Sequence, residues 1–109
     1  MIEAAANDPF KIELEDGVAY PIGDGLMVVL QADEKAPEGG HSVAITKADL
    51  ANLSEAKGLH PVALEEDGGE AICIGDTWVL KQPDVSREGH PMQRAVVTWQ
   101  DVEAMLAAA

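Results

Sequence analysis

The chain repeats short motifs at a nearly constant spacing. The tripeptide Ile-Gly-Asp stands at residues 22–24 and again at 74–76, and the segment 46–50 is matched by 98–102, both 52 residues further on. Each copy of a repeated unit must bury its own apolar residues in the same way, so this repetition constrains the architecture more than any single motif does. Further matches are residues 28–31 with 78–81, and Gly40 and His41 with Gly89 and His90.

The chain has the length of a single domain. At 109 residues it is long enough for a single core, whereas a unit of about 50 residues buries too little apolar surface to be stable alone. Hydrophobic residues make up 47% of the chain and aromatic residues only 4%, so an aliphatic core is expected. We therefore predict a single domain over residues 1–109, in which the repeats 10–58 and 60–109 share one core.

Alternation and turn residues predict the elements of the first repeat. Apolar and charged residues alternate from Phe10 to Leu14, which is typical of a half-buried strand, and an acidic turn follows at 15–17. Residues 33–41 contain Pro37 and glycines among charges and are expected to form a loop. The other strands of this repeat are expected at 18–22, 26–32 and 42–45.

A capping box begins the helix of each repeat. The Thr46 hydroxyl can cap the first turn while Asp49, three residues later, reaches back, and Thr98 with Asp101 repeats this pattern. Gly58 and the proline after it are expected to end the first helix. The strands of the second repeat are expected at 62–64, 71–74, 77–81 and 94–97.

Strands followed by one short helix, made twice, predict an α+β fold. We expect an antiparallel sheet with the two short helices packed against it, and an internal duplication that relates the two halves by pseudo-two-fold symmetry. Cys73 is expected to be a buried residue of an apolar strand rather than a reactive nucleophile, and Trp78 is expected in the core.

The net charge of −13 limits the partners of this protein. Twenty acidic residues outnumber seven basic ones along the whole length, so the folded surface must be strongly negative. Such a surface repels nucleic acid and anionic membranes and attracts basic protein surfaces, although acidity also serves solubility alone. The start of the chain lacks the basic residues of a signal peptide, and no apolar run reaches membrane-spanning length, so a cytoplasmic protein is expected.

Signatures of catalysis or cofactor binding are missing from the sequence. His41 and His90, with Glu38 or Glu88, are the best candidates for a metal site, but the chain lacks the cysteine pairs or closely spaced histidines of a zinc site. No serine stands in a nucleophile elbow, and the Ile-Gly-Asp segments are explained by hairpin turns. We therefore expect no enzyme, no metal and no cofactor.

Acidic turns and one tryptophan form the expected partner surface. The turns at 15–17 and 65–69 are equivalent in the two repeats, so symmetry can place them on one face. Trp99, in the first turn of the second helix, is an interface anchor if it is exposed, and otherwise packs against the sheet edge. The candidate contact residues are Glu13, Glu15, Asp16, Glu65, Glu66, Asp67, Glu70 and Trp99.

Two function hypotheses follow from these observations. In the first, the chain is a non-enzymatic interaction module, in its sharpest form a mimic whose carboxylates replace nucleic-acid phosphates and block a basic, nucleic-acid-binding protein. It resembles small acidic phage-encoded inhibitors of restriction or CRISPR systems in size and charge, without a shared motif. In the second, the chain is an assembly subunit or adaptor that forms homo-oligomers, such as a homodimer, through Trp99, Met105 and Leu106. A metal- or ligand-binding enzyme comes third.

Overall fold

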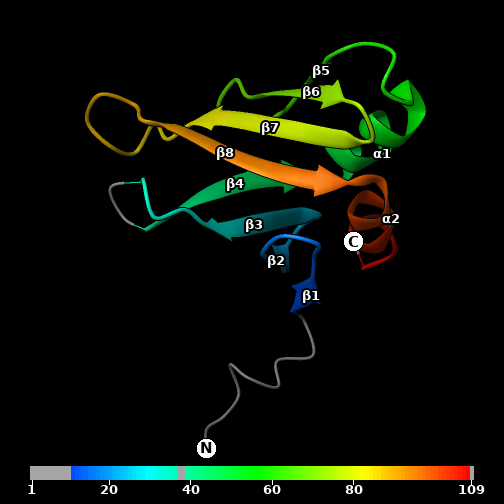
Figure 1. The fold of residues 1–109 in the computed structure, drawn as a ribbon, viewed down its shortest axis with the longest axis horizontal. Coiled ribbons are helices and arrows are strands. Elements are labelled where there is room, and N and C mark those ends of the chain that lie inside the picture. Colours follow the sequence, from blue (N-terminus) through cyan, green and yellow to red (C-terminus); the bar gives the residue numbers. More distant parts are fainter. Residues whose placement is uncertain (1–10, 37–38, 109) are drawn as a thin grey trace, which may run out of the picture.

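A computed structural model describes residues 11–36 and 39–108. The described residues form two four-stranded antiparallel sheets, each followed by one helix (Figure 1). The first sheet has the order β1 (Ile12–Glu13), β2 (Val18–Gly23), β3 (Leu26–Ala32) and β4 (Gly40–Thr46), and leads into α1 (Lys47–Ala56). The second has the order β5 (Val62–Ala63), β6 (Glu70–Ile74), β7 (Thr77–Pro83) and β8 (Met92–Thr98), and leads into α2 (Trp99–Ala108).

The predicted α+β class is confirmed, with antiparallel strands and two short helices. Both halves have the same element order and the same neighbour pairing, which is compatible with an internal duplication. The strands nevertheless form two sheets where one was expected. Phe10, the expected start of the first strand, lies outside the described residues. No helix in the described part of the chain is long and apolar enough to cross a membrane.

Glutamine side chains join the two sheets at their inner edges. β4 and β8 pack against each other, but their backbones belong to different sheets. Gln82 of β7 donates to the carbonyl of Ala44 over 2.8 Å and accepts its N–H over 2.9 Å. Gln31 of β3 forms the same pair of bonds with Val96, over 2.6 and 2.8 Å. Side-chain amides therefore take the place of a backbone ladder, which explains why the eight strands do not form one sheet.

Both predicted capping boxes are present. Thr46 Oγ1 accepts the N–H of Asp49 over 3.0 Å, and Asp49 Oδ2 accepts the N–H of Thr46 over 3.0 Å. Thr98 and Asp101 repeat these bonds over 3.1 and 2.9 Å. α1 ends at Lys57, which adopts a left-handed conformation (φ 52°) and is followed by a glycine, as expected for a helix terminus.

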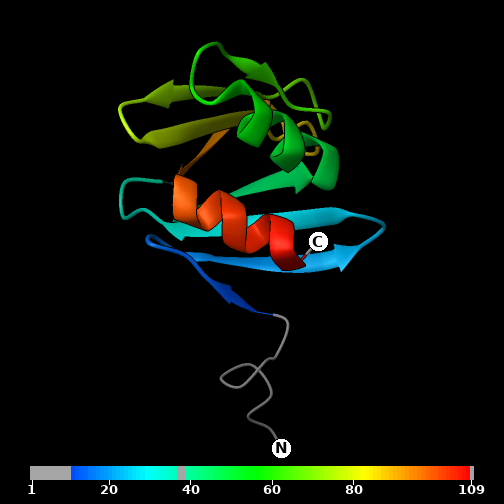
Figure 2. The same ribbon diagram turned by 90° about the vertical axis from the view of Figure 1, so that its right-hand side faces the viewer.

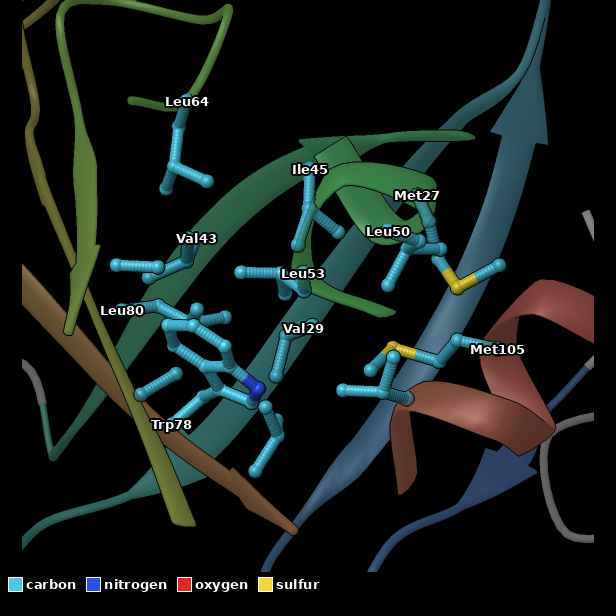
Figure 3. Packing of buried hydrophobic residues seen from close by; sticks show 14 of the residues in the cluster. Met27, Val29, Val43, Ile45, Leu50, Leu53, Leu64, Trp78, Leu80 and Met105 are labelled. Carbon is cyan, nitrogen blue, oxygen red and sulfur yellow. The ribbon is translucent and has the colours of Figure 1, made fainter. Parts of the chain in front are cut away.

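A single hydrophobic cluster contains residues from both halves (Figure 3). Trp78 is fully buried, as predicted, and belongs to this cluster together with aliphatic side chains of both sheets and both helices. Cys73 lies in β6, as expected, but it is half-buried rather than buried, because it stands near the turn of the β6–β7 hairpin, at the edge of the core. The other large side chains of the cluster are Met27, Val29, Val43, Ile45, Leu50, Leu53, Leu80, Val97, Val102 and Met105.

Candidate interaction surface

Each acidic turn is held in place by the helix of the other half. The N–H of Glu15 donates to Oδ1 of Asp101 over 2.9 Å, and the N–H of Glu65 donates to Oδ1 of Asp49 over 3.0 Å. Asp101 is 6% exposed and Asp49 is fully buried, whereas Glu15 and Glu65 are exposed. The buried carboxylates therefore hold the backbone of the turns and leave the glutamates at the surface.

The two acidic turns lie at opposite sides of the molecule. Figure 2 shows the turn at 15–17 beside the start of α2, and the turn at 65–69 beside the start of α1. The expectation that symmetry brings both turns to one face is therefore wrong. The reason is that each turn is hydrogen-bonded to the helix of the other half, and the two helices begin at opposite sides.

Acidic residues from both halves line one surface hollow at the start of α2. Glu15 of the first half and Asp76 of the β6–β7 turn line a surface hollow of about 400 Å³, together with Thr98, Trp99 and Gln100. At the start of α1, the corresponding acidic residues are Glu65 and Asp24, but the position equivalent to Trp99 is the exposed Lys47. The starts of α1 and α2 therefore have similar acidic residues nearby, but α1 begins with Lys47 where α2 begins with Trp99.

Trp99 is half-buried and packs against the core. Its ring lies edge-on to Trp78, with ring centroids 5.5 Å apart and an interplanar angle of 69°. Trp99 also borders a second hollow of about 340 Å³ between the two helices, which Ser54, Lys57, Val102 and Glu103 line. Trp99 was expected either as an exposed interface anchor or packed against the sheet edge, and this geometry is closer to packing. Part of the residue still faces the surface, where it lines both hollows.

The other predicted contact residues are divided between the two sides. On the first-half turn, Glu13 lies 3.1 Å from the ammonium of Lys11, and Asp16 is exposed while its carbonyl accepts a hydrogen bond from Gln31. On the second-half turn, Glu66 is half-buried and its carbonyl accepts from the Gln82 amide. Asp67 and Glu70 are exposed.

His41 lies in β4 and not in the loop where it was expected. It stands opposite Gln31, in the position that Gln93 occupies opposite Gln82, so the predicted match of His41 with His90 is wrong. The second long loop is one residue longer than the first, since the N–H groups of Asp33 and Asp84 bond to the carbonyls of Gly39 and Pro91. His90 is exposed in that second loop.

His41 is bonded to a carboxylate rather than placed among metal ligands. Its Nε2 lies 3.0 Å from Oδ2 of Asp33, while Nδ1 is buried without a hydrogen-bond partner among the described residues. The backbone N–H of Lys35, and then the imidazole of His41, hydrogen-bond to Asp33 and hold the pKa of its carboxyl below the ordinary value. Within residues 11–36 and 39–108, no group of three or more His, Cys, Asp or Glu side chains is placed to hold a metal ion; Glu38 lies outside that part.

Asp76 and Glu103 are surface residues that sequence reasoning missed. The Ile-Gly-Asp motif indicated a hairpin turn, and the turn alone accounted for Asp76. The pairing of Thr77 with Thr98 places this turn beside the start of α2, where its aspartate lines the same hollow as Glu15. Comparison of the chain with protein families, with curated proteins and with solved structures finds no match.

Proposed function

We propose that this protein is a small, acidic, non-enzymatic interaction module that docks a basic surface of a partner protein. The observation that carries the proposal is the hollow beside Trp99, which carboxylates from both halves line. We call Glu15, Asp76, Trp99 and Glu103 the α2-side surface. A net charge of −13 attracts a basic partner from a distance, and these residues provide the contact.

The α2 side suits a basic partner better than the α1 side does. The exposed Lys47 stands at the start of α1 and repels an approaching lysine or arginine. Trp99 in the same position carries no charge and offers an aromatic contact, a residue type that is enriched in interface hot spots. The proposal therefore assigns the partner to one side of a molecule whose two halves have the same order of elements.

The sharper form of this proposal is nucleic-acid mimicry. The carboxylates of the α2-side surface then occupy the site where the partner binds phosphates. If the partner binds nucleic acid, duplex DNA is expected to compete with this protein for it. If the partner does not bind nucleic acid, added DNA is expected to leave the complex unchanged. Competition thus separates mimicry from ordinary acidic docking.

Charge reversal on each side tests the proposal. The double variant Glu15→Lys with Asp76→Lys changes the α2-side surface, and Glu65→Lys with Asp24→Lys makes the matched change at the α1 side with the same net charge. Against a labelled peptide of lysine and arginine, we expect the first variant to lose about tenfold in affinity, equivalent to about 1.4 kcal/mol, and the second about twofold. Fluorescence anisotropy at one fixed ionic strength measures both.

Equal losses in the two variants contradict the proposal, because binding then follows total charge rather than the α2-side surface. Wild type and the two variants, used in parallel as baits in host extracts, then identify the partner. It is the basic protein that the α1-side variant retains and the α2-side variant loses.

A further inference from the structure

We infer that the outer face of the first sheet, the side turned away from the core, is where a second copy of this chain binds. This inference does not depend on the proposed function. β3 carries five consecutive apolar residues, from Leu26 to Leu30. Met27 and Val29 point into the core and are 2% and 0% exposed, so the residues that alternate with them lie on the outer face. An apolar run without alternation is typical of a strand that is covered on both faces, and the core covers only one of them.

The outer face is apolar across three neighbouring strands. Val18 of β2 pairs with Leu30, and Tyr20 of β2 pairs with Val28. Val28 in turn pairs with Ala44 of β4. Side chains that stand opposite one another on the same face are close enough to touch, so these five residues form one continuous surface without a charge. The residues that alternate with them on β2 and β4 are fully buried on the core side: Ala19, Val43 and Ile45.

The second sheet has a charged row where the first sheet has an apolar one. Glu70 pairs with Lys81, and Lys81 pairs with Arg94, and all three residues are exposed. Because both halves have the same strand order, this architecture does not require an apolar outer face. Leu30, which stands in the position of Lys81, is nevertheless 39% exposed. The corresponding row of the first sheet consists of Val18, Leu30 and Ser42.

The absence of charge from these five residues selects the occupant. A partner rich in lysine and arginine would have to bury its charges against an uncharged surface, which is costly when no carboxylate pairs with them. A second copy presents the same uncharged surface. At the edge of this surface, Glu13 of β1 pairs with Val18 in the strand register and lies 3.1 Å from the ammonium of Lys11. Two outer faces can therefore meet without burying a charge from β2, β3 or β4.

The sizes of the side chains also fit a two-fold contact. Tyr20 stands at the β2 end of its row and the small Ala44 at the β4 end, with Val28 between them. A two-fold axis parallel to β3 sets β2 of each copy over β4 of the other, so that Tyr20 lies over the partner's Ala44. Sheets that pack face to face in this way lie about 10 Å apart, with strand directions within about 30°. Closed two-fold dimers are also the commonest form of homo-oligomer.

Sedimentation of the full chain at two salt concentrations tests for this dimer. We expect association to be about tenfold tighter in about 0.5 M NaCl than in about 0.05 M NaCl, because salt screens the repulsion between two molecules of like charge while the contact itself is uncharged. Each copy has a net charge of −13. Binding of a basic partner to the α2-side surface has the opposite salt dependence, so the two kinds of association are distinguishable.

A double variant transfers the charged pair of the second sheet to the first. Val18→Glu with Leu30→Lys copies the pair formed by Glu70 and Lys81 and leaves the net charge unchanged. We expect it to weaken dimerisation by about a hundredfold, because both copies would have to bury these charges. Glu70→Lys with Lys81→Glu, the matched control, exchanges the charges of the second sheet and should leave dimerisation unchanged. Circular dichroism checks that both variants fold.

Intermolecular NOEs between isotope-labelled and unlabelled wild-type chains locate the contact without any substitution. We expect them between Tyr20 and Ala44 and between the methyl groups of Val28 in the two copies.

Four results overturn the inference. A monomer at both salt concentrations does so, and so does a dimer that the folded Val18→Glu, Leu30→Lys variant retains. A dimer whose intermolecular NOEs come from Trp99, Met105 and Leu106 would place the contact on α2 instead. If the full chain is a monomer and a variant without residues 1–10 dimerises, that segment covers the outer face. These results leave the proposed function to its own test, because the outer face contains neither Glu15 nor Asp76.

Discussion

At the scale of single residues, the buried Asp49 and Asp101 each stabilise the start of a helix and also an acidic turn. Asp49 accepts the N–H of Thr46 at one oxygen and the N–H of Glu65 at the other. A carboxylate buried away from water is costly unless it is hydrogen-bonded, and backbone N–H groups supply that compensation here. Asp101 has the same bonds, so each aspartate links its own helix cap to the acidic turn of the other half.

Asp49→Ala should lower the free energy of unfolding by about 2–4 kcal/mol, since it removes the capping box and leaves a buried N–H without its acceptor. Urea denaturation followed by circular dichroism measures the loss. Glu55→Ala, at an exposed position of the same helix, should change the free energy by less than about 0.5 kcal/mol. A loss in Asp49→Ala no greater than this control would contradict the linking role.

At the scale of elements, the edges of β4 and β8 are covered by side chains rather than by another strand. An unpaired strand edge is open to association with other chains, and the glutamines remove that hazard by binding the edge groups. Gln82 forms three hydrogen bonds, to the N–H and carbonyl of Ala44 and to the carbonyl of Glu66. On the same edge, Gln93 accepts a hydrogen bond from the N–H of Ser42.

Gln82→Ala should therefore cost more stability than Gln93→Ala, about 2–3 kcal/mol against about 1 kcal/mol, because it leaves more buried backbone groups unpaired. Hydrogen exchange followed by NMR supplies the local readout. In Gln82→Ala, exchange of the Ala44 amide should accelerate more than that of the Val96 amide, which Gln31 still binds. Equal acceleration at both amides would show that the glutamine acts only on global stability.

At the scale of the whole molecule, one shared core has to overcome the mutual repulsion of its acidic residues. A net charge of −13 on 109 residues destabilises the compact state, and added salt screens this repulsion. Between about 0.01 M and about 1 M NaCl the screening length falls from about 30 Å to about 3 Å.

The melting temperature should rise by several degrees over that range, because a gain of about 1 kcal/mol corresponds to about 4–8 °C for a domain of this size. Thermal unfolding followed by circular dichroism measures the rise. The less negative variant Glu15→Lys with Asp76→Lys should show a smaller rise than wild type. A melting temperature that stays constant or falls with salt would mean that the carboxylates do not repel one another significantly.

The residues that sequence reasoning placed correctly belong to local structure. The capping boxes at Thr46 and Thr98 involve residues three positions apart, and hairpin turns with glycine are equally local. The placement of Trp78 in the core followed from its apolar strand. Alignment across the long loops was less secure: the shared Gly-His dipeptide suggested a match of His41 with His90, whereas the strand pairing makes Gln93, three residues later, the equivalent of His41.

By itself, the sequence determined the helices, most of the strands, the α+β class and a strongly negative surface, because these depend on near neighbours or on composition. Only the tertiary structure decided that the acidic turns lie on opposite sides and that Glu15 and Asp76 line one hollow with Trp99. Those positions depend on how one half packs on the other through Asp49, Asp101 and the glutamines. Such contacts join residues 16 to 86 positions apart in the sequence, and the spacing of residues within one half does not predict them.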